Sequence, residues 1–169
     1  MDEADRLIDM FRDRAASPVA SKLDALIKLE RSSEPGVVPF LVHILADQRE
    51  SEEVRIHVLK RLRNGRLSPE HRSIVAEANL HVLQNDASAA VRLHASMALG
   101  EFTDIDGVPA ALGRLAFDWN ESIDIRYSAF TSLQRTGPTT ECIALLRQLS
   151  TDQLLGSSAQ GVLSSWHLE

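Results

Sequence analysis

One short pattern recurs along this chain and restricts the folds that it can adopt. It consists of an aliphatic residue, an arginine, a small or branched residue three positions later, a leucine four positions after that, and then a glycine. Clear copies contain Arg55, Arg92 and Arg126, and weaker copies lie at Lys22 and Gly156. The four basic residues are 33, 37 and 34 positions apart. Repeats of this length are typical of helix pairs that stack on their neighbours into a solenoid.

The apolar residues of each copy lie on one face of a helix. Positions −1, +3, +4 and +7 relative to the basic residue are mostly apolar, which is the helical period. A second helical segment precedes each copy, Ser68-Pro69 has the form of a helix start, and Gly65, Gly100 and Gly137 stand where a left-handed C-cap residue is wanted. We therefore predict helices at 3–14, 18–31, 35–47, 52–63, 69–84, 88–100, 106–117, 121–135, 138–149 and 151–165.

These elements predict the fold class, an all-α, right-handed α–α superhelix of about five two-helix repeats. The single expected domain spans 1–169, with repeats at about 3–31, 35–63, 69–100, 106–135 and 138–165. Aromatic residues make up only 5% of the chain, which favours helices packed through alanine and leucine over a β-sandwich.

Composition also narrows the expected location and partners. No apolar run is long enough for a membrane helix, and the acidic start of the sequence lacks the apolar segment of a secretory signal. The single cysteine, Cys142, allows no intrachain disulfide and no multi-cysteine metal site. We expect a cytoplasmic protein with no membrane partner. The formal net charge of −6 disfavours a general nucleic-acid binder, because phosphate contacts need a basic face.

The segment from Asp86 to Gly100 resembles the second helix of a HEAT repeat, in particular the bacterial, armadillo-like subgroup known from phycobilisome lyases. The resemblance rests on the pattern Asp-x-Val-Arg-x-x-Ala-x-x-Ala-Leu-Gly, and it extends more weakly over most of the chain. In that family the acid and the arginine pair across stacked repeats and form a polar ladder. The resemblance therefore implies a structural ladder made of Asp47, Arg55, Asp86, Arg92, Asp118 and Arg126.

Solenoids of this kind usually bind partners on the concave face, which the second helix of each pair lines. Counting from each basic residue gives the exposed positions of that face. The middle of it is best supplied with side chains that suit a protein interface: His57, Lys60, His94, Met97, Thr131 and Arg135. His57 and His94 hold equivalent positions in adjacent repeats, but no third ligand accompanies them at a suitable spacing. We therefore predict no metal site.

Charge is unevenly distributed along the sequence. A basic patch formed by Arg61, Arg63 and Arg66 lies partly on a turn, whereas acidic residues dominate between Glu101 and Asp124. The two regions either orient a charged partner or reflect chance clustering on solvated helix ends. Trp119 is either an exposed anchor for a partner or a staple that holds its loop on the core.

The sequence contains no motif of a hydrolase nucleophile, a phosphate-binding loop or a metalloprotease. The neighbours of Cys142 indicate a buried and unreactive thiol. We therefore expect a non-enzymatic scaffold or adaptor that binds another protein on the concave face and needs no cofactor. Two alternatives stay open: an accessory subunit of the bilin-lyase type, and a nucleic-acid-binding solenoid.

Overall fold

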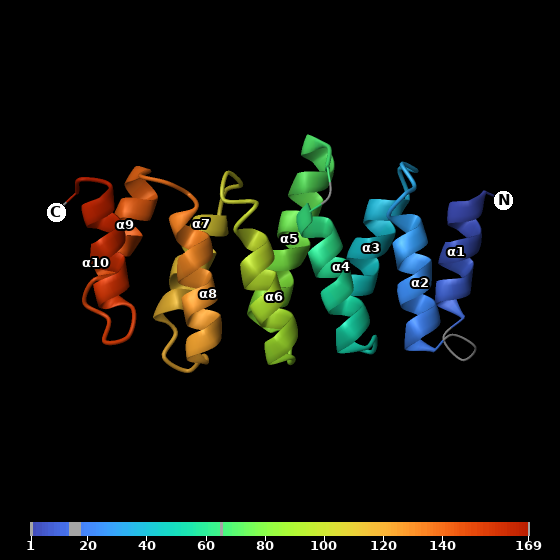
Figure 1. Cartoon of the computed structure of the whole chain (residues 1–169), viewed down its shortest axis with the longest axis horizontal. Coiled ribbons are helices and arrows are strands. Elements are labelled where there is room, and N and C mark those ends of the chain that lie inside the picture. The colour runs from blue at the N-terminus through green and yellow to red at the C-terminus, as the bar shows by residue number, and fades with distance from the viewer. Residues whose placement is uncertain (1, 14–17, 65, 169) are drawn as a thin grey trace. The chain divides into compact units, whose positions relative to one another are not determined.

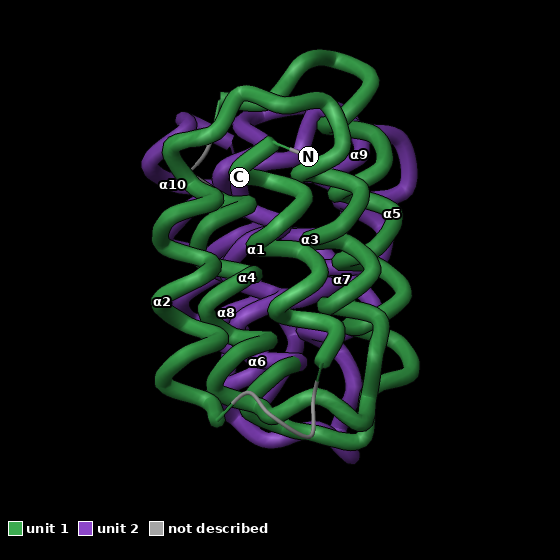
Figure 2. Tube along the Cα trace, turned by 90° about the vertical axis from the view of Figure 1, so that its right-hand side faces the viewer, with its two compact units in different colours: residues 1–91 green, residues 92–169 purple. Residues whose placement is uncertain are grey.

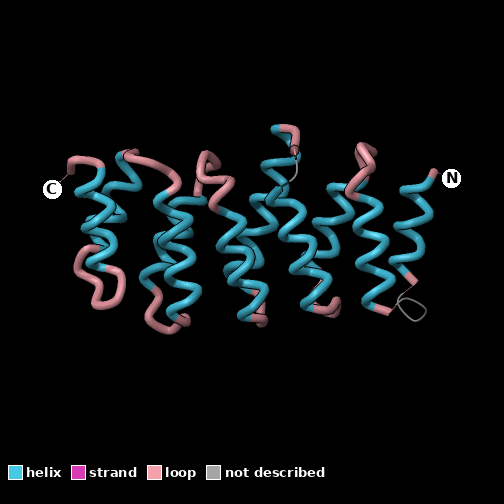
Figure 3. The backbone as a smooth tube through the Cα atoms, in the orientation of Figure 1, coloured by secondary structure: helices cyan, strands magenta, loops and turns pink. Residues whose placement is uncertain are grey.

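The computed structural model describes residues 2–13, 18–64 and 66–168, and every regular element in these segments is a helix (Figures 1 and 3). The bounds are α1 Glu3–Arg12, α2 Val19–Leu29, α3 Val37–Ala46, α4 Glu52–Asn64, α5 Pro69–Asn85, α6 Ala89–Leu99, α7 Val108–Phe117, α8 Ile123–Gln134, α9 Thr140–Leu149 and α10 Gly156–Ser165. Each predicted helix is present. None of the described helices is long and apolar enough to cross a membrane.

The chain divides into two compact units, residues 1–91 and residues 92–169 (Figure 2). We call them unit 1 and unit 2; the division falls within α6. The prediction of one domain over 1–169 stays a prediction.

In unit 1, α1 packs on α2 and α3 packs on α4, while α3 also contacts α5 and α2 contacts α4. The helices therefore form two rows, with α1, α3 and α5 in the first row and α2 and α4 in the second. Leucines at the predicted apolar positions, such as Leu29, Leu45 and Leu62, are almost completely buried between the rows. Ser68 caps α5 by accepting a hydrogen bond from the His71 amide, and Pro69 follows at the first helical position, as predicted.

In unit 2, α7 packs on α8, α9 packs on α10, and α7 and α9 lie side by side in the first row. Leu112, Ile125, Leu133 and Leu146 fill the interior between the rows. The α7–α8 and α9–α10 turns lie at the same end of this unit (Figure 1). That arrangement places residues 118–122 near residues 150–155.

Two expectations about helix ends are wrong. The last helix begins at Gly156 instead of residue 151, because the Asp152 carboxylate accepts hydrogen bonds from the amides of Leu154 and Leu155 and holds a turn there. Gly137 has the predicted left-handed conformation, with φ +80°, but Gly100 does not. An added Cβ at Gly100 would lie 3.1 Å from the Ser132 hydroxyl, so close packing favours glycine there. Gly65 lies outside the described residues.

Candidate functional site

The recurring basic residues bind carboxylates of the following repeat, and they do so within each unit. In unit 1, Lys22 pairs with Glu50 and Arg55 pairs with Asp86. In unit 2, Arg92 pairs with Glu121 and Arg126 pairs with Asp152. We call these four ion pairs the polar ladder: Lys22–Glu50, Arg55–Asp86, Arg92–Glu121 and Arg126–Asp152.

The two buried arginines of the ladder also satisfy a helix end. Arg55 Nε donates to the Leu45 carbonyl at 3.0 Å, and Arg126 Nε donates to the Ala116 carbonyl at 2.8 Å. Leu45 and Ala116 are in the last turn of α3 and α7, where carbonyls lack an intrahelical partner and the helix dipole is negative. Each arginine therefore joins a first-row helix to the acid of the next repeat. This geometry explains why a cation recurs at the start of second-row helices, and it gives these residues a structural role.

For two of the predicted ladder acids, a nearby glutamate makes the ion pair instead. Asp47 accepts hydrogen bonds from the backbone and side chain of Arg49, and Asp118 accepts one from the Asn120 amide, so both organise their own turns. The acids that bind Lys22 and Arg92 are Glu50 and Glu121, three positions later. These turns contain two more residues than the turn at Asp86. The ion pair is therefore made by the glutamate, whose side chain is longer, and not by the aspartate.

The carboxylates of unit 2 in the ladder are held ionised. The hydrogen bond from Arg92 lowers the pKa of Glu121. Burial raises the pKa of Asp152, but the hydrogen bonds from the Leu155 and Leu154 amides and from Arg126 outweigh it, so the pKa lies below its usual range. Both ion pairs therefore persist throughout the neutral pH range.

The predicted concave-face residues are divided between the units. In unit 1, His57 Nε2 lies 3.0 Å from a Glu30 carboxylate oxygen, and Lys60 is exposed. In unit 2, His94 is half-buried, Met97 and Thr131 are exposed, and Arg135 pairs with Glu101 at 2.8 Å. The described segments contain no group of three or more histidine, cysteine or acidic side chains that could hold a metal ion.

The predicted basic patch lies where α4 ends and α5 begins. Arg61 donates from Nη2 to the Glu30 carbonyl at 3.1 Å, Arg63 is half-buried and Arg66 is exposed. Arg61 and Arg66 line one pocket, in which His71 also lies.

The largest exposed apolar side chains of unit 2 lie in the α7–α8 turn, in the first half of α8 and in the α9–α10 turn. The exposed fractions are 65% for Trp119, 46% for Ile123, 55% for Tyr127 and 60% for Leu154. Ile123 and Tyr127 are one turn apart on α8, so they share a face. The Arg126 guanidinium lies 5.6 Å from the Trp119 ring centre and also binds Asp152, whose turn contains Leu154. We call these four residues the aromatic surface.

Sequence reasoning left Trp119 undecided and missed the other three members of this surface. The Trp119 ring is 65% exposed, with Arg126 5.6 Å from its centre, so most of the ring is not packed on the core. Ile123 and Tyr127 occupy positions −3 and +1 relative to Arg126, outside the buried set at −1, +3, +4 and +7. Large apolar residues at positions outside the buried face were the signal that could have identified them.

Unit 2, which carries the aromatic surface, has an excess of negative charge. Residues 92–169 contain nine carboxylates against five arginines and no lysine. Three of these arginines, Arg92, Arg126 and Arg135, are already engaged in ion pairs. Asp118 and Asp124 flank Trp119 and Ile123, are exposed, and have no basic partner in the part of unit 2 that the structure describes.

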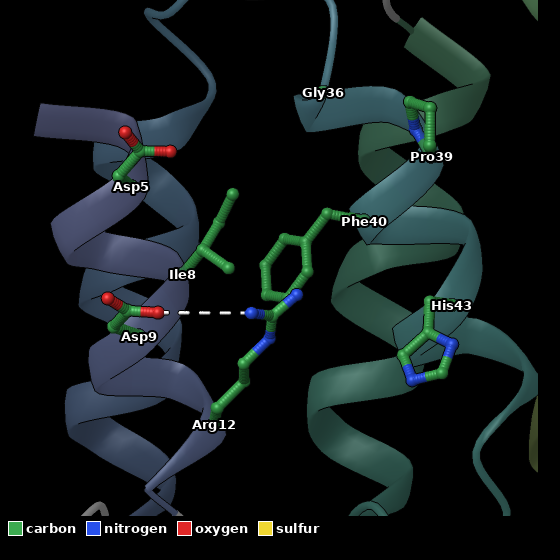
Figure 4. Close-up of a pocket in the computed structure, with 8 residues that line it drawn as sticks. All are labelled: Asp5, Ile8, Asp9, Arg12, Gly36, Pro39, Phe40 and His43. Atoms are coloured by element: carbon green, nitrogen blue, oxygen red, sulfur yellow. Dashed lines mark ion pairs between the residues drawn. The ribbon is translucent and has the colours of Figure 1, made fainter. Parts of the chain in front are cut away.

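A second hollow lies between α1 and α3 in unit 1, with a volume of about 590 Å³ (Figure 4). Ile8 and Phe40 supply its apolar part, Arg12 extends across it, and His43 lies on α3. Arg12 is paired with Asp9 at 3.8 Å, although both side chains are mainly exposed. The groove is open, and it contains charged residues of both signs that are exposed to solvent. These residues therefore favour no particular class of ligand, whereas those of the aromatic surface do.

Cys142 is fully buried, and burial raises the pKa of its thiol to about 11. Its Sγ lies 3.5 Å from the Leu133 carbonyl oxygen, to which it donates a hydrogen bond. Since the thiolate is the reactive form, we expect iodoacetamide at pH 8 to alkylate native Cys142 at least about a hundredfold more slowly than the urea-unfolded chain. Mass spectrometry of timed samples measures both rates, and comparable rates would contradict the burial of this thiol.

In the segments that the structure describes, all regular elements are helices, and α1–α2, α3–α4, α7–α8 and α9–α10 pack as pairs. This arrangement defines the class of protein, an all-α helical repeat. No family model matches the chain, and no curated protein sequence is significantly similar to it. Among solved structures, human deoxyhypusine hydroxylase in complex with glycerol is similar over 95% of this chain, with a TM-score of 0.62 and 17% identity. The match covers 62% of that protein's chain. The predicted all-α superhelix is therefore confirmed.

The likeness corrects the functional expectation from the sequence. We predicted a non-enzymatic scaffold because no catalytic motif was found, but a protein of similar fold is a hydroxylase. The prediction of a non-enzymatic scaffold is therefore wrong. At 17% identity the likeness extends to the fold alone, so function has to be argued from the surfaces of this chain.

Proposed function

We propose that unit 2 docks a basic segment of another polypeptide on the aromatic surface formed by Trp119, Ile123, Tyr127 and Leu154. The observation that carries the proposal is the exposure of both Trp119 and Tyr127, with the Trp119 ring beside Arg126, the residue that precedes Tyr127 on α8. Tryptophan and tyrosine are enriched among the residues in which the binding energy of protein interfaces concentrates.

Charge determines the kind of segment that fits. Asp118 and Asp124 lie beside the two rings, and the excess of carboxylates in residues 92–169 gives this unit a negative field. Lysine and arginine side chains can both pair with these carboxylates and stack on the faces of the rings. Aliphatic or aromatic neighbours of the basic residue would cover Ile123 and Leu154. A nucleic acid would be repelled, because its phosphates meet carboxylates here.

The proposed partner is a protein, as expected from the sequence, but the proposed binding surface is the aromatic surface and not the predicted set of concave-face residues. Thr131, from the predicted set, follows Tyr127 by one turn on α8 and extends the same face. We also propose that the chain belongs to the HEAT-repeat class, because its ladder joins a basic residue to the acid of the following repeat. A cytoplasmic location, expected from the sequence, is part of the same proposal.

Selection of short random peptides displayed on phage, with the full chain as bait, tests this proposal. We expect enrichment of peptides in which lysine or arginine stands beside leucine or an aromatic residue. Binding should weaken as salt is raised, because the exposed carboxylates contribute through screened charge. Enrichment of acidic peptides, or of none, would count against the proposal.

Replacing Trp119 by alanine should weaken binding of a selected basic peptide by about 30-fold or more, the effect of losing a central aromatic anchor. Fluorescence anisotropy with the labelled peptide measures the affinity. The control is Ile27→Ala in unit 1, which removes a similarly exposed apolar side chain and should leave binding unchanged. If both variants bind like the parent chain, the aromatic surface is not the site.

The acidic contribution can be separated from the apolar one. The double change Asp118→Asn, Asp124→Asn should reduce affinity several-fold at low salt and have little effect at high salt. Asp106→Asn with Glu141→Gln is the matched control, because it removes the same charge from exposed residues at the starts of α7 and α9, away from the turns that follow these helices. Equal effects of the two double changes would indicate that only the general field of the unit matters.

A further inference from the structure

The pocket at the α4–α5 turn of unit 1 has a composition unlike that of the aromatic surface. Its volume is about 190 Å³, and it lies between the turn that follows α2 and the start of α5. A water molecule occupies about 30 Å³ of liquid, so the pocket has room for about six waters or for a small tetrahedral group with a partial shell. The residues that give it its chemistry are Ser32, Glu34, Arg61, Arg66 and His71.

Arg61 contributes a cation that forms no ion pair with any residue in the described segments. Its Nη2 donates to the Glu30 carbonyl at 3.1 Å, which holds the guanidinium in place. The Glu30 carboxylate lies 3.0 Å from His57, and the Nε of Arg61 is buried with no hydrogen-bond acceptor. Because the partner of this half-buried guanidinium is a neutral carbonyl, no carboxylate bound to it in the described segments balances its charge. An anion in the pocket would provide the missing charge.

Further donors line the same space. Arg66 is exposed and His71 is half-buried, and in the described part of the chain neither side chain pairs with a carboxylate. The Ser32 hydroxyl oxygen accepts a hydrogen bond from the Glu34 amide at 3.2 Å, so its proton is available for a ligand. The start of α5 adds the positive end of a helix dipole.

One group opposes an anion here. Glu34 lines the pocket, is exposed, and forms no ion pair with a described residue. Its single negative charge shares the pocket with two arginines, so the balance of charge among the lining residues is positive. Glu34 also provides a test, because its removal should favour an anion.

We propose that this pocket is a subsite for a phosphate group, supplied either as inorganic phosphate or as a phosphate monoester on a small ligand. Planar guanidinium forks match the oxygens of phosphate and bind them through charge-assisted hydrogen bonds. The three types of donor, guanidinium, imidazole and hydroxyl, approach from different elements, which suits a tetrahedral anion with several acceptor oxygens better than a planar carboxylate. The proposal concerns unit 1 and is independent of the docking surface of unit 2.

Calorimetric titration of the full chain at low ionic strength with inorganic phosphate, O-phosphoserine and acetate tests the subsite. Both phosphates should bind, and acetate should bind about tenfold more weakly or not at all. Tighter binding of O-phosphoserine would identify a monoester as the natural ligand, and tighter binding of inorganic phosphate would identify the free anion. Acetate binding as strong as that of phosphate would overturn the proposal.

Two variants locate the binding. Arg66→Ala should weaken phosphate binding about tenfold or more, since it removes an exposed donor without touching the core. Glu34→Gln should strengthen it by about two- to fivefold, the effect of removing one exposed charge. The control is Arg6→Ala, which removes the same charge from the exposed surface of α1 and should have no effect. Equal losses in Arg66→Ala and Arg6→Ala would show that binding reflects only the net charge of the chain.

Discussion

Replacing Arg126 by alanine is expected to lower the free energy of unfolding by about 3–5 kcal/mol, the cost of breaking a buried ion pair by removing one partner. The Arg126 side chain is 3% exposed and that of Asp152 is 2% exposed, with 2.6 Å between Nη2 and the carboxylate oxygen. The substitution leaves a buried carboxylate without its cation and the Ala116 carbonyl without a donor. Urea unfolding of the variant and the parent chain measures the loss as a lower midpoint concentration, with the same dependence of the unfolding free energy on urea concentration.

The matched control is Arg114→Ala on α7 of the same unit. Arg114 is exposed, and its removal should change the free energy of unfolding by no more than about 0.5 kcal/mol. If Arg126→Ala is as mild as this control, the polar ladder does not hold the repeats of unit 2 together.

The deficit of Arg126→Ala should depend on pH. Because the pKa of Asp152 is depressed in the folded state, its contribution to stability is present above the unfolded pKa of about 3.9 and is lost as the pH falls through the folded value. In the variant the same carboxyl lacks its cation and takes up a proton at a higher pH. The difference between the two proteins should therefore be largest near neutral pH and become smaller in acid.

The helices were predictable because each follows from a local rule. The buried face repeats every 3.6 residues, and N-cap residues such as Ser68 and C-cap glycines such as Gly137 mark the ends. The spacing of the basic residues also predicted which helices stack. The start of α10 was missed because Asp152, which the pattern treats as helical, is drawn into a turn by Arg126 and two backbone amides.

The identity of the ladder acids was harder to predict, because it depends on which carboxylate is long enough to contact the basic residue and not on the sequence pattern. Asp47 and Asp118 match the family motif in sequence, yet the turns that contain them are longer than the turn at Asp86. In those turns the aspartate binds a local amide, and the glutamate three positions later spans the distance to the cation. Only coordinates show which of two nearby carboxylates faces the arginine or lysine.

The candidate surfaces were predicted only in part. The basic patch and Trp119 were identified from composition, but Glu34, Ser32 and His71 join Arg61 only through the packing of turns that are distant in sequence. Tyr127 was overlooked because concave-face positions alone were considered. Exposure is a property of the assembled helices, and the sequence pattern reports only the side that is buried.

Replacing Lys22 by methionine is expected to cost about 3–5 kcal/mol of unfolding free energy, because the buried Glu50 carboxyl group would lose its cation. Lys22 Nζ lies 3.1 and 3.0 Å from the two oxygens of Glu50, and the side chains are 8% and 3% exposed. Phe11 also loses the cation 5.3 Å from its ring centre. The double change Lys22→Met, Glu50→Leu should recover most of the loss, since buried ion pairs are often replaceable by apolar residues of similar size.

An exposed ion pair of the same unit supplies the control. Lys28 and Asp24 are 2.9 Å apart, as close as Lys22 and Glu50, but their side chains are 55% and 61% exposed. Lys28→Met should therefore cost less than about 1 kcal/mol. Both pairs join a lysine of α2 to a carboxylate at a similar distance, so a difference in their effect on unfolding free energy reports the effect of burial. A double variant no more stable than Lys22→Met alone would mean that Glu50 is needed for its hydrogen bond to the Ser51 amide, and that the ion pair is secondary.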